Sequence, residues 1–411
     1  MRILNFLIVV LAFFAGSCAT SRIAENENSK DKKLNSVKAY YYDSTGLKVL
    51  DTETNTKKSL IEFTHMLVQR KISPDNSKIA INYFENDSSK IVTIDTNTER
   101  IWEIETKTDQ YLFTFEWSPS SDSLAVGYFT EKKSGDRNVA GEGGIFISSI
   151  DGIKREVGCS VSKSVYAWLP DGRLAVSSGF GSEYIYIVNN ENCNTIQTIN
   201  KKDKKDIIFS PDGNKILFTR FEEVYNISYD TNQNLPELYI LDVESNKETK
   251  IAGYQYKPRN ASWSPDGTKV AFDIQSDKWS NVHHIAIYDL EKGEAQFIVD
   301  RDRFYGVSND QNPHWDKTGS RLLINRSYES TRGLVINQKI IRNLSNGKEI
   351  KLVEKINDPN YHNDIRIGTT LDWFGDDIIA FAGSGYKVFN TVGDEVLSLS
   401  NYQNLLFVAS K

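Results

Sequence analysis

A short turn motif, "SPDG" or a close variant, recurs seven times along the chain, each time between an aromatic or aliphatic residue and an apolar run. The clearest copies are "FSPDGNKILF" from Phe209 and "WSPDGTKVAF" from Trp263. Pro presets φ, Asp bonds to nearby backbone amides and Gly closes the turn without steric cost. Each copy therefore predicts a tight turn, and the apolar triplet after it, such as Ile216–Phe218, predicts a strand buried on both faces.

The residue that precedes each turn also repeats. Five of the seven tryptophans in the chain occupy this one position, which chance placement does not explain. We expect the side chains at this position to have one structural role in every repeat. They are Trp117, Trp168, Phe209, Trp263, Trp315 and Trp373, with Ile72 in the first copy.

A second signal follows each turn motif: an apolar strand that ends in Asp or Asn, and then a polar turn. Examples are "LYILDVESNKE" at 238–248 and "IAIYDLEKGE" at 285–294. The repeating unit is thus strand, tight turn, strand, loop, strand, tight turn, strand. Units recur at intervals of roughly 40 to 60 residues, the length of one β-propeller blade.

These residues resemble the TolB-type β-propeller family, whose WD40-like repeat carries the same Pro-Asp turn. The resemblance covers about Val37 to Lys411. It implies an all-β fold, a single propeller of four-stranded antiparallel blades. It implies little about function, because propellers support many activities.

The number of blades depends on the two ends of the chain. There are seven turn motifs but eight strand-then-Asp signals, and the chain ends in an unpaired strand pattern, "NLLFVAS". We expect this last strand to pair with the N-terminal strands and close a ring of eight blades, which leaves no long unpaired edge. Seven blades is the alternative, if the terminal strands only complete an existing blade.

The N-terminus has the pattern of an export signal. Residues 1–17 carry one early Arg, an apolar run too short to span a bilayer, and small residues before Cys18. "FAGSC" resembles a bacterial lipobox, and on that resemblance Cys18 is lipidated and residues 18–36 form a flexible tether. An ordinary cleaved signal with a chance cysteine is the alternative. We expect a lipoprotein of the bacterial cell envelope, at the outer membrane facing the periplasm or at the cell surface.

Two further cysteines, Cys159 and Cys193, could form a disulfide in an oxidising envelope. They could equally be two buried, unpaired thiols. Because connectivity cannot be deduced from sequence, we favour the unpaired state.

The charge distribution bears on possible partners. The formal net charge is −6, which disfavours general binding to a phosphate backbone. The densest basic run, Asn200–Asp206, is interrupted by aspartates and is interpreted as a solvated loop. We expect no nucleic-acid partner.

The repeat also predicts which end of the blades is functional. Both tight turns lie at one end, whereas the long, aromatic-rich and charged connections, including 129–144 and 220–237, lie at the other. Binding residues concentrate on loops of a rigid scaffold, so we expect the ligand at the second end. Arg259, His314 and Asp372 should approach the central channel there, either as ligand contacts or as ordinary polar lining.

No G-x-S-x-G motif or other catalytic constellation occurs, and no cofactor is expected. The sequence therefore favours a non-catalytic module that binds an envelope protein segment or glycan. The alternative is a metal-dependent lyase or hydrolase acting on oligosaccharides, suggested only by histidines near the long connections. These are His283, His284, His314 and His362.

Overall fold

The computed structural model describes residues 37–410, apart from several short segments. The omitted segments are 44, 63–66, 86–87, 105–109, 135–136, 160–163, 179–181, 227–230, 276–281, 299–308, 330–334, 358–369, 375–377, 383–385, 391–394 and 400–403. The predicted signal, Cys18 and the tether lie outside the described residues, as does His362. No helix in the described part of the chain is long and apolar enough to cross a membrane.

The chain divides into two compact units, and unit 1 is formed by its two ends, residues 1–64 and 363–411. Unit 1 contains two four-stranded sheets, in the orders β3-β2-β1-β32 and β28-β29-β30-β31. The strands are β1 (Val37–Asp43), β2 (Gly46–Asp51), β3 (Thr56–Ile61), β28 (Thr370–Phe374), β29 (Ile378–Ala382), β30 (Tyr386–Asn390), β31 (Glu395–Leu399) and β32 (Asn404–Ser410).

The C-terminal strand pairs with the N-terminal one, as predicted. Strand β32 runs antiparallel to β1, from Val37 opposite Ser410 to Tyr42 opposite Asn404. One sheet of unit 1 therefore contains both ends of the folded chain. That all the sheets close into one ring stays a prediction.

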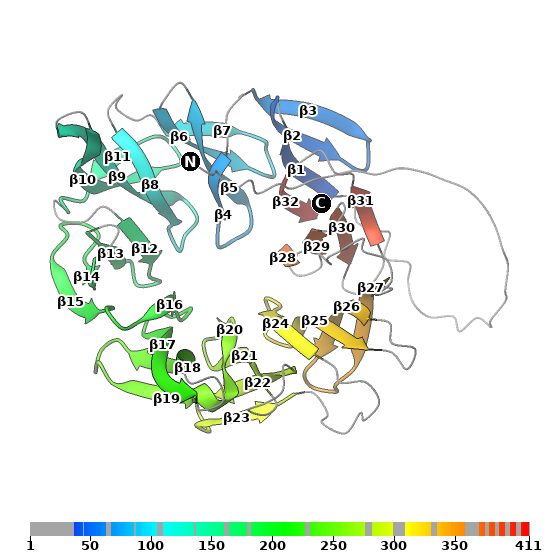
Figure 1. Ribbon diagram of the computed structural model, residues 1–411. Coiled ribbons are helices and arrows are strands. Elements are labelled where there is room, and N and C mark those ends of the chain that lie inside the picture. Colours follow the sequence, from blue (N-terminus) through cyan, green and yellow to red (C-terminus); the bar gives the residue numbers. More distant parts are fainter. Residues whose placement is uncertain are drawn as a thin grey trace. The chain divides into compact units, whose positions relative to one another are not determined.

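Unit 2, His65–His362, contains six four-stranded sheets that follow one another in chain order (Figure 1). With the two sheets of unit 1, the described residues form eight such sheets. The strands of unit 2 are β4 (Leu67–Ile72), β5 (Lys78–Glu85), β6 (Ser88–Asp95), β7 (Ile101–Ile104), β8 (Gln110–Trp117), β9 (Ser123–Ser134), β10 (Arg137–Ser149), β11 (Lys154–Glu156), β12 (Ser164–Trp168), β13 (Leu174–Ser177), β14 (Tyr184–Val188), β15 (Thr195–Asn200), β16 (Lys205–Phe209), β17 (Lys215–Asn226), β18 (Thr231–Asp242), β19 (Glu248–Ala252), β20 (Arg259–Trp263), β21 (Lys269–Gln275), β22 (His283–Asp289), β23 (Glu294–Phe297), β24 (Asn309–Trp315), β25 (Arg321–Glu329), β26 (Val335–Asn343) and β27 (Glu349–Asn357).

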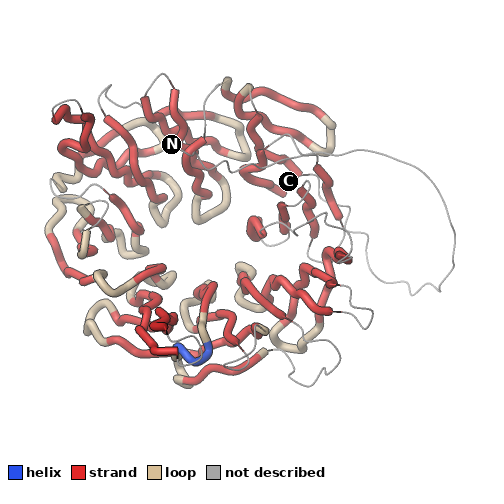
Figure 2. Tube along the Cα trace, in the orientation of Figure 1, coloured by secondary structure: helices blue, strands red, loops and turns tan. Residues whose placement is uncertain are grey.

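All strand pairs within these sheets are antiparallel, so each sheet of unit 2 has two distinct ends. The turn end carries the tight turns from first to second strand and from third to fourth. The connection end carries the links from second to third strand and from each sheet to the next. Among the described residues of unit 2, the only helix is the short 3-10 helix η1 (Tyr254–Tyr256), which lies in the link between β19 and β20 and is blue in Figure 2.

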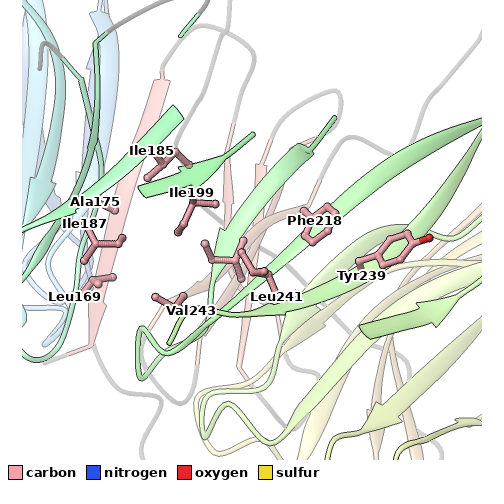
Figure 3. Close-up of a cluster of buried hydrophobic side chains, with 10 residues drawn as sticks. Leu169, Ala175, Ile185, Ile187, Ile199, Phe218, Tyr239, Leu241 and Val243 are labelled. Carbon is pink, nitrogen blue, oxygen red and sulfur yellow. The ribbon is translucent and has the colours of Figure 1, made fainter. Parts of the chain in front are cut away.

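The second strand of each sheet of unit 2 is buried on both faces, as the apolar triplets predict. In β17, Ile216 and Phe218 pack into a cluster with the preceding sheet, where Leu169 and Ile185 lie (Figure 3). Leu217 points the opposite way and packs with Trp263 and other residues of the following sheet. Because successive side chains of a strand alternate between faces, one triplet joins three sheets.

The repeated turn has the predicted chemistry. The Ser210 hydroxyl donates to Asp212 at 2.5 Å and accepts the backbone N–H of Lys215 at 2.9 Å. Gly213 adopts φ +74°, a left-handed conformation that favours glycine. Its Cα also packs closely against Leu169 of the preceding sheet, where a Cβ would lie only 3.1 Å from the leucine side chain. Each turn is therefore stabilised internally and also packs against its neighbour.

The repeated aromatic position links neighbouring sheets of unit 2. Each residue ends the first strand of its sheet, and the indole N–H of Trp263 donates to the carbonyl of Ile208, one residue before Phe209 in the preceding sheet. Trp315 donates to Ser262 in the same way, and Trp117 to Lys71. These three tryptophans thus make the same contact, a hydrogen bond from the indole to the first strand of the preceding sheet.

A β-bulge interrupts the first strand in each sheet of unit 2. The register shifts within β4, β8, β12, β16, β20 and β24. Three of the bulged residues, Asp206, Asn260 and Asn312, have φ near +50°, which Asp and Asn tolerate better than most residues. The bulges change the direction of side chains near the connection end.

Two predicted loops are instead extended hairpins. Strands β9 and β10 remain paired as far as Ser134 opposite Arg137, and β17 and β18 as far as Asn226 opposite Thr231. The segments 129–144 and 220–237 are therefore mostly strand. They extend the connection ends of their sheets with hydrogen-bonded backbone.

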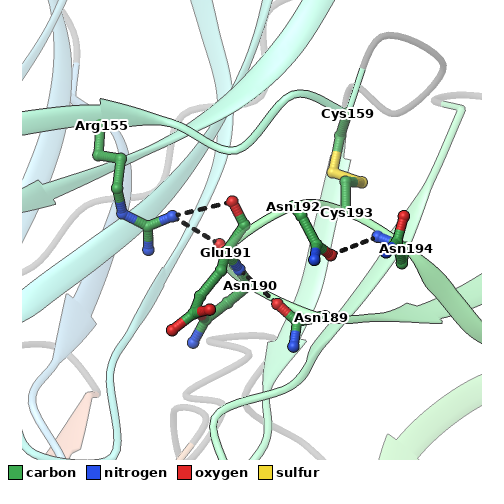
Figure 4. Close-up of a disulfide and its surroundings, with 8 residues drawn as sticks. All are labelled: Arg155, Cys159, Asn189, Asn190, Glu191, Asn192, Cys193 and Asn194. Atoms are coloured by element: carbon green, nitrogen blue, oxygen red, sulfur yellow. Dashed lines mark hydrogen bonds between the residues drawn. A yellow bond between two sulfur atoms is a disulfide. The ribbon is translucent and has the colours of Figure 1, made fainter.

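The favoured unpaired state of Cys159 and Cys193 is wrong, because the two form a disulfide (Figure 4). It joins the segment after β11 to the turn between β14 and β15, with a Cα–Cα distance of 5.3 Å. Both residues pack in the apolar cluster between these sheets. Periodicity could not show this pairing, since the turn that presents Cys193 belongs to a different sheet.

Reduction of this disulfide should destabilise unit 2. A bridge between cysteines 34 residues apart reduces the conformational entropy of the unfolded chain. This raises the free energy of unfolding by about 3 to 4 kcal/mol. We expect dithiothreitol to lower the melting temperature of the wild-type protein by several degrees, measured by circular dichroism. The Cys159→Ala/Cys193→Ala variant should melt at the lower temperature with or without reductant. A wild-type melting temperature that reductant leaves unchanged would contradict this.

Candidate functional site

The first group at the connection end is organised by Asp273 of β21, whose side chain is completely buried. Its carboxylate accepts hydrogen bonds from Arg259 Nε at 2.8 Å and Asn260 Nδ2 at 2.9 Å. The backbone N–H of Asn312, in the next sheet, donates to it at 3.3 Å. Asp273 thus holds together the bulges of two neighbouring first strands.

Burial and neighbouring charges set the ionisation of this group. Burial raises the pKa of Asp273, and the hydrogen bonds from Arg259 and Asn260 oppose that rise. Burial also lowers the pKa of His283 to about 4, and the positive charge of Arg259 acts in the same direction. His283 Nδ1 lies 3.6 Å from the Asp273 carboxylate, beyond hydrogen-bond length. At neutral pH the imidazole is therefore uncharged beside an ion pair of Asp273 and Arg259.

The three predicted channel residues have different surroundings. The Arg259 side chain is 45% exposed but its guanidinium binds Asp273. His314 is half-buried in β24, opposite Leu323. Asp372 lies in β28 of unit 1, and its side chain is not described. The positive charge of Arg259 is thus paired with a carboxylate of the protein itself, so the residue has a structural role.

Among the described residues, no three His, Cys, Asp or Glu side chains come together as a metal ion would require. His283 and His284 are described, and His362 is not.

The second group involves the basic run at 200–206, which is not simply a solvated loop. Its last two residues begin β16, and Lys204 is only 8% exposed. Lys204 Nζ lies 2.8 Å from Glu248, and Arg220 pairs with both Glu248 and Asp203. These ion pairs fix the link between β15 and β16 to the sheet that follows it.

A pocket of about 470 Å³ opens beside this link, between the sheets β12–β15 and β16–β19. The sequence interpretation missed it, although four lysines within five residues at a link between sheets were a usable signal. Its lining is polar except for one aliphatic residue and one tyrosine ring. The lining residues are Tyr166, Ser182, Glu183, Lys201, Lys202, Lys204, Lys205, Asp206 and Ile207.

Tyr166 and Lys201 form the aromatic side of this pocket. Tyr166 is the extra residue in the bulge of β12 and is 37% exposed. Lys201 Nζ lies 2.6 Å from the Tyr166 hydroxyl and 4.9 Å from the ring centroid. The contact places an ammonium group and an exposed ring next to each other, a combination suited to a polar ligand with a negative charge.

Comparison with known proteins identifies the fold. Residues 108–307, slightly under half of the chain, match the family model "Eukaryotic translation initiation factor eIF2A". A solved structure described as "Crystal structure of the eukaryotic initiation factor" is 12% identical, with a TM-score of 0.55, over 91% of this chain and 97% of that chain. No curated protein matches the sequence. The chain has a WD40-like β-propeller fold of four-stranded antiparallel blades.

Two other solved structures are similar at lower scores. The β-propeller domain of the Trilobed protease from Pyrococcus furiosus is 14% identical, with a TM-score of 0.49, over 82% of this chain and 98% of that chain. Oligogalacturonate lyase in complex with manganese is 11% identical, with a TM-score of 0.44, over 88% of this chain and 83% of that chain.

Replacing Arg259 should destabilise unit 2 in a pH-dependent way. Arg259→Ala leaves the buried Asp273 carboxylate with fewer partners, which should cost about 2 to 3 kcal/mol of unfolding free energy at pH 7. The Asp273 pKa is already raised in the folded protein and should rise further. A raised carboxyl pKa gives stability that is present at low pH and lost as pH rises. The cost should therefore be smaller at pH 4 than at pH 7.

Urea unfolding at both pH values measures this effect. Adding Asp273→Asn to the Arg259→Ala variant removes the buried charge and should recover part of the stability at pH 7. An equal loss at pH 4 and pH 7 would show that Arg259 acts through packing and not through the charge of Asp273.

Proposed function

We propose that the chain is a non-catalytic binding lipoprotein of a bacterial cell envelope, with TolB-type propeller repeats. The connection end of unit 2 captures a protein segment or glycan of that envelope. The observation that carries this proposal is the asymmetry between the two ends of the sheets. The turn end has tight turns of a few residues, whereas the connection end has two extended hairpins and the polar pocket.

The scaffold suits such a role. Its second strands are packed on both faces, so the connection end stands on a rigid base, where binding loops are commonly found. The β17–β18 hairpin also presents Phe221, which is 47% exposed, and aromatic side chains of this kind are enriched at binding interfaces. We transfer no translational role, because a 12% identical structure supports the fold alone.

The proposed location is supported by the N-terminal sequence and by the disulfide. Residues 1–17 have the pattern of a lipoprotein signal, and Cys18 stands where a lipidated cysteine is required. The bridge between Cys159 and Cys193 is consistent with an oxidising compartment outside the cytosol.

Trimming both hairpins tests the binding role. In this variant, Asn-Gly turns replace 131–141 in β9–β10 and 223–234 in β17–β18, leaving the pairs Phe129–Gly143 and Glu222–Leu235 in register. Full-length wild-type protein in detergent should retain a discrete component of its own envelope extract, identified by mass spectrometry and sugar analysis. The trimmed variant should melt within a few degrees of wild type and retain at least about tenfold less.

The matched control changes the turn end only. Lys292→Ala/Lys317→Ala alters two exposed lysines there and should retain the component as wild type does. Equal retention by the trimmed variant would refute capture by the hairpins. If no variant retains anything, the binding proposal fails, and depolymerisation of envelope glycans becomes the activity to assay.

The lipid anchor gives a separate prediction. Wild-type protein should sediment with membranes and carry acyl chains at Cys18, detected by intact-protein mass spectrometry. Cys18→Ala should move the protein to the soluble fraction, since the anchor is lost. Membrane association of this variant, or an unmodified Cys18 in the wild type, would contradict the proposed anchor.

A further inference from the structure

We propose that the pocket between the sheets β12–β15 and β16–β19 binds an acidic sugar unit of an anionic glycan. Lys201 and Lys205 receive its carboxylate, and the exposed ring of Tyr166 packs against the sugar ring. This assignment rests on the proposed function, because it names the ligand class for the same connection end.

The backbone builds this pocket from two neighbouring bulges. In β12 the register shifts between Val165 and Ala167, which leaves Tyr166 as the extra residue. In β16 it shifts between Lys205 and Ile208, and Asp206 there has φ +50°. Bulges redirect side chains and are common beside functional sites. Both bulges contribute residues to the pocket lining.

A charge network beneath the link holds the pocket in place. Lys204 is buried, contacts Glu248 and Asp203 at 2.8 and 3.1 Å, and lies over the Phe218 ring. Arg220 bonds to the same two carboxylates. The link is thus anchored before any ligand arrives, which reduces the entropy lost on binding. The carboxylates of Glu248 and Asp203 are thus already paired with Lys204 and Arg220.

Two lysines of the lining remain without an acidic partner. Within the part of the chain that the structure describes, neither Lys201 nor Lys205 forms an ion pair, and Lys201 contacts the hydroxyl and ring of the neutral Tyr166. Lys202 has Glu183 at 3.5 Å, but both side chains are largely exposed, so this pair is weak. The pocket therefore offers positive charge to a small anion.

The rest of the lining favours a sugar over other anions. Ser182, Glu183 and Asp206 supply hydrogen-bonding groups for hydroxyls, and Ile207 is the one aliphatic residue of the lining. A peptide would bring side chains that need apolar subsites, or would need an open strand edge. A nucleic acid would need a long basic track, whereas the whole chain has a net charge of −6. A volume of about 470 Å³ holds a small number of sugar rings.

Isothermal titration of the full-length protein in detergent tests the assignment. The probes are tetrasaccharides of β-1,4-linked glucuronate and α-1,4-linked galacturonate, the same tetrasaccharides with every carboxylate reduced to an alcohol, and hexaglutamate. At least one acidic tetrasaccharide should bind. Its reduced form should bind about tenfold more weakly or worse, and sodium chloride at 0.5 M should weaken binding of the acidic form.

Variants assign that binding to the pocket. Lys201→Ala/Lys205→Ala should raise the Kd for the acidic tetrasaccharide about tenfold or more, since it removes both unpaired cations. Tyr166→Ala should weaken the acidic and the reduced form alike, and Tyr166→Phe should retain most of the affinity. Lys247→Ala/Lys317→Ala removes the same charge at the turn end and should leave the Kd within about twofold.

Several results would overturn the assignment. They are no binding of either acidic tetrasaccharide at 10 mM, equal binding of the reduced forms, or tighter binding of hexaglutamate with the same lysine dependence. If an envelope component is still captured in a hairpin-dependent way that Lys201→Ala/Lys205→Ala leaves intact, the sugar assignment fails while the binding function stands. If hairpin trimming has no effect but the lysine variant loses the tetrasaccharide, the pocket stands and capture by the hairpins fails.

Discussion

The packing of each second strand against sheets on both sides is the interaction on which unit 2 depends. An apolar triplet such as Ile216–Phe218 cannot be satisfied within its own sheet, because its side chains alternate between two faces. Two residues pack against the preceding sheet and one against the following sheet. A sheet of this kind is therefore stable only between neighbours. The tryptophan-to-carbonyl hydrogen bonds add a directional contact at the same junctions.

This packing determines where the chain can vary. The turn end is constrained, because each turn packs against the neighbouring sheet and supplies its own hydrogen bonds. The connection end has no such requirement, and the extended hairpins and the bulges occur there. Cations without an acidic partner lie at one of these places, beside Tyr166. Arg259, in contrast, pairs with the buried carboxylate of Asp273, and Lys204 pairs with the half-buried carboxylate of Glu248. Cations that are paired with carboxylates of the protein form a structural network, whereas cations without such a partner mark a candidate ligand site.

Much of the fold could be predicted from the sequence, because the residues of each repeat have clear local preferences for a turn or a buried strand. The turns, the buried triplets, the shared position of the tryptophans and the pairing of the last strand with the first follow from local patterns. The hairpins were harder to predict, since polar residues such as those at 223–226 and 231–234 form strands only when a paired partner continues alongside. The disulfide and the pocket depend on contacts between sheets, about which spacing along one chain carries no information.

The predicted site was less complete for the same reason. Arg259 lies in a segment that the sequence places at the connection end, but the sequence does not show that its charge pairs with the buried carboxylate of Asp273. The sequence predicts a solvated loop at Lys201 and Lys205 because aspartates interrupt the basic run, but one of these, Asp203, is paired with Arg220 and Lys204. Whether a run of charged residues can bind a ligand therefore depends on which of its side chains already form ion pairs in the folded protein.

Hydrogen–deuterium exchange of the full-length protein, with and without saturating acidic tetrasaccharide, would show where the ligand binds. We expect slower exchange in peptides that contain Tyr166 and residues 200–209, with no change at the turn-end segments 189–194 and 243–247. Protection confined to the turn end, or spread evenly over all the sheets of unit 2, would contradict this expectation.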